Sequence, residues 1–316
     1  MMMRKGSSDK GAESMKKVGF IGVGKMGRYM AENLLDSGYE LTVYDSNSEA
    51  AKPLSERGAV VAASIQELGM QHEVVITMVP NSSIVESVVL GDGGLLHSMK
   101  TGGTIIDMSS AYVLSTKELA QKGRASGITL IDAPVSGGVK GAKEGSLTIM
   151  VGADKEEDFL KAIPILRVMG KKVNHVGSTG SGHALKAINN YLSATSLYAT
   201  TEAMMLIKKL GIDQKVALEI INSSSGQSFS THYKFPSFIL PRSFNSGFSL
   251  DLLLKDVGMV TNIAKDMKVP VLLASLVEQI YEGASISGNL EQDHTEIIKF
   301  LERISNDRLQ SKEAFT

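Results

Sequence analysis

Short apolar runs alternate with segments of helical periodicity over the first half of the chain. The run Val18 to Val23 is followed by a helical pattern and then by a second apolar run, "ELTVY". Further runs of this kind lie at 73–80, 103–110, 128–136, 147–153 and 171–177. The alternation predicts an α/β fold with an open, largely parallel, doubly wound sheet whose ligands bind beyond the carboxyl ends of the strands.

The pattern changes after residue 178, where strand-like runs give way to helical periodicity. Long helices are expected at 182–210, 213–222, 249–267 and 270–286, with a loop-rich insert at 223–248, a short amphipathic helix at 292–304 and a frayed tail at 306–316. Residues 1–14 are polar and are expected to be a disordered tail. The sequence therefore predicts an α/β domain over 15–178, then an all-helical domain over 179–316 that begins with a long interdomain helix.

Composition excludes several classes of protein. The 316 residues are 43% hydrophobic and 21% charged, which suits about two cored domains. With 33 basic and 34 acidic residues the net charge is -1, so no nucleic-acid partner is expected. No apolar run approaches about 18 residues, so no membrane span is expected. The chain has no cysteine, which fits a cytoplasmic protein, and its histidines have no metal-ligand spacing, so no metal is expected.

A glycine-rich motif follows the first apolar run. Gly22, Gly24 and Gly27 form G-x-G-x-x-G between a strand and a helix, and Asp45 ends the second strand eighteen residues after Gly27. Such glycines allow a tight turn, a close approach to a pyrophosphate and close helix packing. A purely structural turn, a kinase loop and a methyltransferase loop are the alternatives, and no V-A-I-K lysine supports a kinase. The order of strand, loop, helix and acid favours a dinucleotide.

Asp45 bears on which dinucleotide is bound. Its carboxylate is expected to accept hydrogen bonds from the adenosine ribose and to repel a 2′-phosphate, which favours NAD over NADP. Lys52 lies near enough in the sequence to keep NADP open. The alternative for Asp45 is that it starts the turn or caps the next helix, and one residue can do both.

Polar or glycine-rich turns follow three of the other strands. They are Val79-Pro80-Asn81, Ser109-Ser110 and Ser136-Gly137-Gly138. Because the carboxyl ends of parallel strands share one edge of a sheet, these turns are candidate ligand contacts. Turn chemistry alone could explain each of them singly.

A polar stripe runs along the first helix of the second half. Lys186, Asn189, Asn190 and Ser193 fall at i, i+3, i+4 and i+7, so they share one helix face. An exposed lysine on a solvated face is one interpretation. The other is a functional site, because the small and apolar neighbours predict a largely buried helix, in which an unused ammonium would be costly.

Four motifs together resemble the β-hydroxyacid dehydrogenase family, typified by 3-hydroxyisobutyrate dehydrogenase. They are "GFIGVGKMGRYMAENLL" at 19–35, "DAPVSGGVKGAKEGSLTIMVGA" at 132–153, "GSGHALKAINN" at 180–190 and "LLKDVGMV" at 253–260. The resemblance covers nearly the whole chain after Met15. It implies a Rossmann-like domain and a helical domain joined by a long helix, an active site in the cleft between them, and homodimers or homotetramers built through the helical domains.

The resemblance also implies a role for individual residues. Lys186 matches the catalytic lysine, Asn190 the substrate-orienting asparagine, and Ser136, Gly137 and Gly138 the loop that holds the substrate carboxylate. Asp256 completes a Lys-Asp pair, and Asn189 either touches the site or caps a backbone group. Relatives often carry Ser-Thr with a proline three residues later, where this chain has Ser110 and then Val113. Cofactor contacts are expected at Gly22, Gly24, Lys25, Met26, Gly27, Asp45, Val79, Pro80, Ser110 and Lys255.

The expected activity is NAD-dependent hydride transfer on a small 3-hydroxy carboxylic acid or its semialdehyde. Lys186 would exchange the hydroxyl proton, and His183 is given a structural or rim role. Alternative substrates are the semialdehydes of tartronate and succinate, 2-formylglutarate and sulfolactaldehyde. A catalytically silent dinucleotide-binding sensor is the alternative of another class, and retention of Lys186, Asn190 and the Ser-Gly-Gly loop favours the enzyme.

Overall fold

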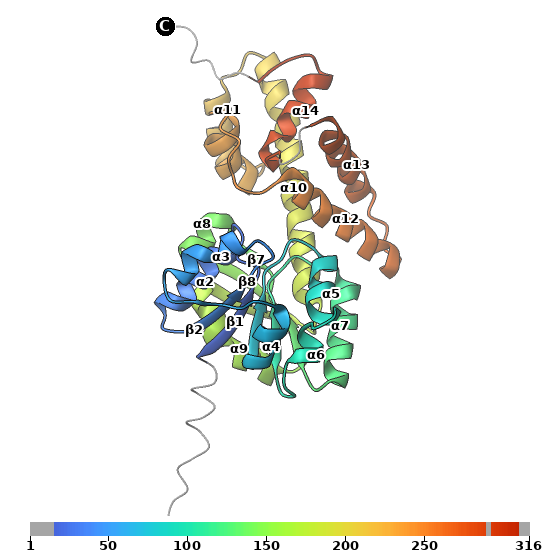
Figure 1. Ribbon diagram of the computed structural model, residues 1–316. Coiled ribbons are helices and arrows are strands. Elements are labelled where there is room, and N and C mark those ends of the chain that lie inside the picture. Colours follow the sequence, from blue (N-terminus) through green and yellow to red (C-terminus); the bar gives the residue numbers. More distant parts are fainter. Residues whose placement is uncertain (1–15, 289–291, 310–316) are drawn as a thin grey trace, which may run out of the picture. The chain divides into compact units, whose positions relative to one another are not determined.

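The computed structural model describes residues 16–288 and 292–309 (Figure 1). They group into two compact units that meet in sequence between Lys186 and Ala187. The tail expected at residues 1–14 lies outside the described residues, and the domain boundary expected at 178 and 179 stays a prediction. Among the described helices, none is both long and apolar enough to cross a membrane.

The first unit is built on a nine-stranded sheet in the order β3-β2-β1-β4-β5-β6-β8-β7, with β9 paired to β8. The six strands from β3 to β6 pair in parallel, β8 runs antiparallel to β6 and β7, and β9 is parallel to β8. This confirms the predicted fold class. The strands are β1 Lys17–Ile21, β2 Glu40–Tyr44, β3 Val60–Val61, β4 Val74–Thr77, β5 Thr104–Asp107, β6 Thr129–Asp132, β7 Val135–Ser136, β8 Leu147–Gly152 and β9 Gly170–Gly177.

Helices cover both faces of this sheet. Successive strand residues point to opposite faces, so Ile105 and Ile106 on β5 enter different hydrophobic clusters, as do Val75 and Ile76 on β4. Consecutive apolar residues in one strand therefore indicate a sheet buried on both sides. The helices are α2 Gly27–Asp36, α3 Ser48–Ser55, α4 Ile65–Gln71, α5 Ser82–Leu90, α6 Leu95–Ser98, α7 Val113–Ala125, α8 Gly138–Lys143 and α9 Glu156–Met169.

The apolar run at 128–136 forms two strands instead of one. The chain breaks at Ala133 and Pro134, after which Val135 and Ser136 pair with the antiparallel β8. Proline has no N–H to give to a ladder and so interrupts a strand. The Ser136-Gly137-Gly138 turn therefore follows the short separate strand β7 and not β6 itself.

The second unit is helical over its described residues, as predicted, around a core that includes Leu197, Phe235, Val257 and Tyr281. One expectation was wrong: the insert at 223–248 contains a partly buried π-helix, η1, whose Phe235 and Ile239 pack into this core. The elements are α10 Ser181–Lys209, which starts in the first unit, α11 Gln214–Asn222, η1 Ser230–Ile239, α12 Leu250–Met267, α13 Leu272–Ser287, η2 His294–Glu296 and α14 Ile297–Ile304.

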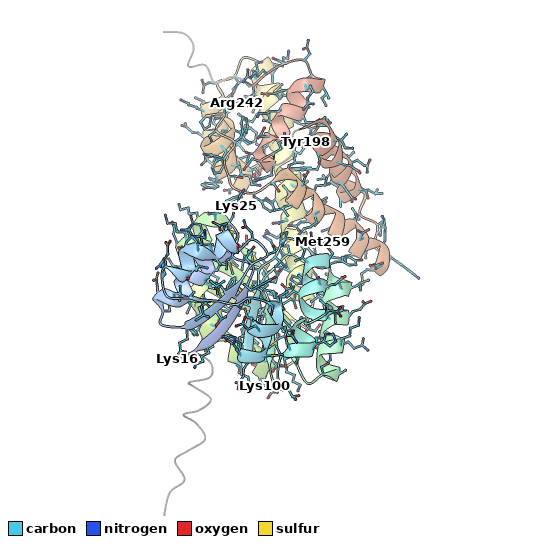
Figure 2. The ribbon with its side chains drawn as sticks, viewed as in Figure 1. Lys16, Lys25, Lys100, Tyr198, Arg242 and Met259 are labelled. Carbon is cyan, nitrogen blue, oxygen red and sulfur yellow. The ribbon has the colours of Figure 1, made fainter. Side chains whose placement is uncertain are left out.

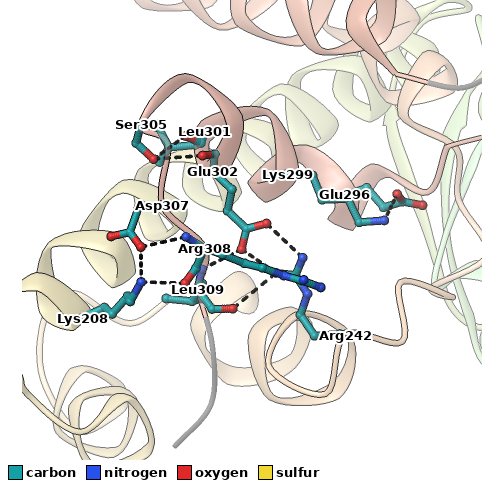
Figure 3. Close-up of polar contacts among 10 residues, drawn as sticks. All are labelled: Lys208, Arg242, Glu296, Lys299, Leu301, Glu302, Ser305, Asp307, Arg308 and Leu309. Carbon is teal, nitrogen blue, oxygen red and sulfur yellow. Dashed lines mark hydrogen bonds and ion pairs between the residues drawn. The ribbon is translucent and has the colours of Figure 1, made fainter.

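The segment after α14 is held by polar contacts (Figure 3). The Arg242 guanidinium donates to both carboxylate oxygens of Glu302, at 2.5 and 2.9 Å. Glu302 also accepts the backbone N–H of Leu309, whose side chain is buried. Asp307 pairs with Lys208 and Lys209, and these contacts lower the pKa of its carboxyl. The expected fraying is therefore wrong for residues 307–309, and 310–316 lie outside the described residues.

A buried histidine stands beside the core of the second unit. His294 Nδ1 donates to the Phe248 carbonyl at 3.1 Å, and Ser246 Oγ lies 3.0 Å from the same nitrogen. Burial, and secondly the positive charge of Lys234, lower the pKa of His294 to about 3, while Asp293 acts in the opposite direction. His294 is therefore neutral in the folded protein near neutral pH.

We expect His294 to make the protein less stable in acid. Between about pH 6.5 and pH 3, His294 binds a proton in the unfolded chain but not in the folded chain. The free energy of unfolding is therefore unaffected by protonation of His294 above about pH 6.5 and decreases as the pH falls below that value. Chemical unfolding followed by circular dichroism should give a loss of roughly 2 kcal/mol from this residue by pH 5. His294→Asn should reduce the loss, and the exposed-site control His97→Asn should not. Equal pH slopes in all three proteins would contradict this assignment.

Candidate active site

The predicted nucleotide contacts of the first unit gather at one edge of the sheet. Strands β2, β1, β4, β5 and β6 are parallel neighbours, so the loops that follow them share that edge. Figure 2 shows Lys25, which follows β1, at the opposite end of this unit from Lys16 and Lys100, which precede β1 and β5. The fold thereby brings together residues from 22 to 138 of the sequence.

The loop between β1 and α2 has the shape that the glycine motif predicts. Gly22 has φ +92°, and a Cβ there would lie 2.3 Å from the Met78 carbonyl oxygen. A Cβ on Gly27 would lie 1.9 Å from the carbonyl oxygen of Gly22. A Cβ on Gly24 would meet nothing within 4 Å, and Gly24 is exposed. The first and third glycines therefore close the turn, while the second leaves backbone open to a ligand.

The N-terminus of α2 offers a site for phosphate. Within the described part of the chain, no side chain caps this end, which begins at Met26, and its first turn has no acidic residue. The positive end of the helix dipole thus faces the open loop. A cavity of about 430 Å³ lies beside it, lined by Val23, Gly24, Lys25, Arg28, Tyr29, Glu49, Ala50, Pro53 and Val139. These features fit a dinucleotide pyrophosphate.

Asp45 joins the glycine loop to the end of β2. Its carboxylate accepts the backbone N–H of Val23 at 2.8 Å and that of Asn47 at 2.9 Å. Asn47, and not Asp45, caps α3 by accepting from Glu49. Lys52 pairs with Glu49 at 2.6 Å. Asp45 therefore starts the turn as the alternative interpretation held, and its fixed negative charge stands beside the glycine loop.

The loops after β4 and β5 are bonded to each other. The Val79 N–H, next to Pro80, donates to Ser109 Oγ at 2.9 Å, and Ser109 N–H donates to Asp107 Oδ1 at 3.1 Å. Asp107 also accepts from the Thr77 hydroxyl at 2.8 Å. Val79, Pro80 and Ser110 thus sit on neighbouring loops whose separation is fixed by buried polar groups.

The turn after β7 presents backbone to the surface. Ser136 is half-buried and pairs with Thr148 of β8, whereas Gly137 and Gly138 are exposed. Neighbouring N–H groups in such a turn suit a carboxylate.

Lys186 lies in α10, three residues after the buried His183. The His183 N–H donates to Asp132 Oδ2 at 2.8 Å, and Asp132 ends β6. This hydrogen bond joins α10 to the carboxyl edge of the sheet, and Lys186 lies in the helical turn that follows it. The Lys186 side chain is half-buried. Such a lysine can give or take a proton there.

The second unit brings three further predicted residues together. The buried Asn190 amide donates to Asp256 Oδ2 at 2.5 Å, and Lys255 Nζ lies 3.4 Å from Asp256 Oδ1. Asp256 thereby fixes the Asn190 amide and leaves its second N–H for another acceptor. Asn189 is exposed and donates weakly to Asn190 Oδ1 at 3.3 Å.

One expectation about this helix was wrong. The helix was expected to be largely buried, yet Leu185 is 41%, Ile188 42% and Leu192 59% exposed. Of the two roles expected for His183, structural or at the rim, its 1% exposure supports the structural one. Helical period gives the face of a residue but not what covers that face, so neither outcome followed from spacing.

Sequence reasoning also missed two residues. Lys234 is buried on η1 and donates to Ser193 Oγ at 2.8 Å, yet its segment read as a loop. Asp132 is buried where β6 ends. An acid closing an apolar run, as in "TLID", was an available signal for Asp132 because such a carboxylate needs partners.

Comparison with known proteins identifies the family. Residues 17–177 match the model of the NAD binding domain of 6-phosphogluconate dehydrogenase. Residues 180–301 match the model described as NAD-binding of NADP-dependent 3-hydroxyisobutyrate dehydrogenase. Together the two matches span both units.

Individual relatives agree with these models. The chain is 39% identical to 2-(hydroxymethyl)glutarate dehydrogenase of Eubacterium barkeri, covering 93% of this chain and 97% of that one. It is 38% identical to human mitochondrial 3-hydroxyisobutyrate dehydrogenase, over 91% and 87% of the two chains. The Mycobacterium tuberculosis 3-hydroxyisobutyrate dehydrogenase structure with L-serine has a TM-score of 0.83 at 30% identity, covering 90% and 98%.

The relatives match nearly their whole length, and the glycine loop and both matched domains are those of a pyridine-nucleotide enzyme. The chain belongs to the β-hydroxyacid dehydrogenase family and is a hydroxyacid dehydrogenase that uses a pyridine nucleotide.

Proposed function

We propose that this enzyme uses NAD to interconvert a small 3-hydroxy carboxylic acid and its semialdehyde, with Lys186 as the acid-base group. One observation carries the proposal. Lys186 occupies the turn of α10 that follows the anchoring of this helix to Asp132, at the sheet edge where the cofactor loops lie. A catalytically silent sensor would need the glycine loop but neither Lys186 nor the Ser136-Gly137-Gly138 turn.

In the proposed mechanism, the glycine loop would hold a pyridine nucleotide, which would supply hydride-transfer chemistry at the carbon that bears the oxygen. In reduction, the Lys186 ammonium donates a proton to the developing alkoxide, which leaves a neutral amine. In oxidation, the amine accepts the hydroxyl proton as the hydride departs. Asn190 orients the substrate through the amide N–H that Asp256 does not use.

The substrate carboxylate is proposed to bind the N–H groups of Gly137 and Gly138, with Ser136 as an additional donor. The relatives named above act on 3-hydroxyisobutyrate and on 2-(hydroxymethyl)glutarate. Both are small β-hydroxy acids, so we propose this substrate class. The semialdehydes of tartronate and succinate, 2-formylglutarate and sulfolactaldehyde belong in the same assay panel.

The preference for NAD over NADP is proposed from Asp45. Its carboxylate is held by Val23 and Asn47 beside the glycine loop, where a ribose 2′-phosphate would meet a negative charge. Lys52, the nearby cation, already pairs with Glu49. Contacts at Lys25, Met26, Val79, Pro80, Ser110 and Lys255 would hold the rest of the cofactor.

We further propose a homo-oligomer built through the helical unit. Exposed apolar side chains lie on α10 at Leu192 and Leu206, 59% and 65% exposed, and on α13 at Leu272 and Ile286, 85% and 82% exposed. Large exposed apolar side chains on these two helices are candidates for contact with a second copy of the chain.

Removing the Lys186 ammonium should abolish turnover without abolishing cofactor binding. Lys186→Ala is expected to lower kcat at least about a hundredfold, the scale of a lost acid-base group. Absorbance at the nicotinamide band measures turnover, and NADH titration measures binding. The control is Lys100→Ala, an exposed lysine at the other end of the first unit (Figure 2). Near-normal activity of Lys186→Ala would remove this residue from the mechanism.

Asp45→Asn should relax the choice of cofactor. Asparagine keeps an oxygen for the Val23 N–H but removes the charge, so the kcat/KM ratio of NADPH to NADH should rise about tenfold or more. Steady-state kinetics with both cofactors measure the ratio, beside the exposed Asp92→Asn as control. An unchanged ratio would show that Asp45 does not select the cofactor.

The oligomer proposal has a direct test in solution. Light scattering coupled to size exclusion should give a mass of two or more chains of 33.8 kDa. A single-chain mass at micromolar concentration would overturn it.

A further inference from the structure

One buried hydrogen-bond network in the first unit includes the Asp132 anchor of α10, and its contacts through the His183 ring have no role in the proposed chemistry. It centres on His183, which is 1% exposed, and on Asp107 and Asp132, which are 1% and 0% exposed. Buried ionisable groups are costly unless their bonds do something for the fold or for function. The network joins elements that are far apart in sequence.

Hydrogen bonds from backbone N–H groups to Asp132 fix where α10 begins. Asp132 accepts the N–H of Gly180 at 2.6 Å and that of His183 at 2.8 Å, one through each carboxylate oxygen. Burial raises the pKa of the Asp132 carboxyl, while the charge of His183 and these N–H groups oppose that rise. A Cβ on Gly182 would lie 2.3 Å from the Met150 carbonyl oxygen and 2.8 Å from Asp132 Oδ2. The helix start is therefore pressed against the carboxyl end of β6.

The ring of His183 reaches two other elements. Its Nε2 donates to the Ser109 carbonyl at 3.1 Å, in the loop after β5. Its Nδ1 lies 2.8 Å from the Thr116 hydroxyl on α7. Carboxylate oxygens of Asp107 and Asp132 stand 3.7 and 4.0 Å from the two ring nitrogens. The His183 side chain thus contacts both the loop after β5 and α7, while the backbone N–H of His183 donates to Asp132 at the end of β6.

Ser109 carries the connection on to the cofactor loops. Its hydroxyl accepts the Val79 N–H, and its own N–H donates to Asp107. The next residue is Ser110. A continuous path of hydrogen bonds therefore runs from the loop after β4, through Ser109, to His183 in α10.

We propose that His183 is a positioning residue, which sets Lys186 relative to the loops that hold the cofactor. Residues at i and i+3 are neighbours on a helix, so the turn held by the His183 ring is the turn that presents Lys186. The proposal rests on the proposed function of Lys186, and it assigns to His183 no contact with substrate. A displacement of about 1 Å between reacting groups can cost orders of magnitude in rate.

Three variants separate positioning from folding. His183→Gln keeps a donor for the Ser109 carbonyl, His183→Ala keeps none, and Thr116→Val removes the second ring contact. The matched control is His175→Gln, because His175 Nε2 also donates to a carbonyl, that of Ala153, at 3.0 Å in the same unit. Circular dichroism and thermal unfolding identify the variants that fold.

The experiment measures kcat, KM and the dissociation constant of NADH for each folded variant, beside wild type and Lys186→Ala. We expect kcat of His183→Ala to fall about tenfold or more, with partial recovery in His183→Gln and NADH binding changed by less than about threefold. A deuterated hydride donor should show a larger isotope effect in His183→Ala, because misplacement slows the hydride step. His175→Gln should resemble wild type.

The outcomes distinguish this proposal from the one on which it rests. If wild type turns over substrate and Lys186→Ala does not, but folded His183→Ala and Thr116→Val keep normal kcat and isotope effects, the positioning role is overturned. Loss of NADH binding in step with kcat would also overturn it, since the network would then act on the cofactor loops alone. Near-normal turnover of Lys186→Ala would instead contradict the proposed function. If His183→Ala does not fold, the other two variants decide.

Discussion

The carboxylate of Asp132 is the constraint on which the geometry of the first unit depends. It is fully buried at the end of β6 and accepts two N–H groups from the start of α10. A buried carboxylate must be satisfied by such donors, so the helix cannot start elsewhere without leaving it unpaired. Local helix propensity could not supply this precision, because it does not distinguish one turn of α10 from the next.

The order of the strands in the sheet brings the other loops of the candidate site together. Parallel neighbours β2, β1, β4, β5 and β6 deliver their carboxyl ends to one edge, so the loops at Gly22, Asp45, Val79 and Ser110 meet there. Backbone hydrogen bonds of the sheet set the spacing between strands, and the bonds among Val79, Ser109 and Asp107 set the spacing between loops. Covering both faces with helices keeps this edge rigid, because each strand is packed from both sides.

The second unit uses buried polar groups differently. Asp256 orients Asn190, and Lys234 reaches Ser193 from η1, within a helical core that contains Tyr281. The Tyr281 hydroxyl donates to the carbonyl of Ala194, and burial raises the pKa of that phenol. Polar groups in a core are stabilising only when each has a partner. These hydrogen bonds therefore fix the orientation of the α10 face that carries Asn190.

Much of this protein was readable from its sequence because the signals are local. The glycine spacing, the strand and helix periods and the position of Asp45 depend on neighbours along the chain, and they predicted the fold class. The same periods put Lys186 and Asn190 on one helix face. Their roles came from the family resemblance and remain proposals.

Only the tertiary structure decided the rest, since it depends on what packs against each residue. The π-helix η1 forms where Phe235 and Ile239 pack into the core of the second unit. Residues 307–309 are fixed because Leu309 bonds to Glu302 and Glu302 pairs with the distant Arg242. Likewise His183 is buried because Ser109, Thr116 and Asp132 converge on it from three separate elements. Periodicity carries no information about such long-range contacts. The sequence therefore determined most of the helices and strands, while the folded chain determined η1, the position of residues 307–309 and the partners of each element.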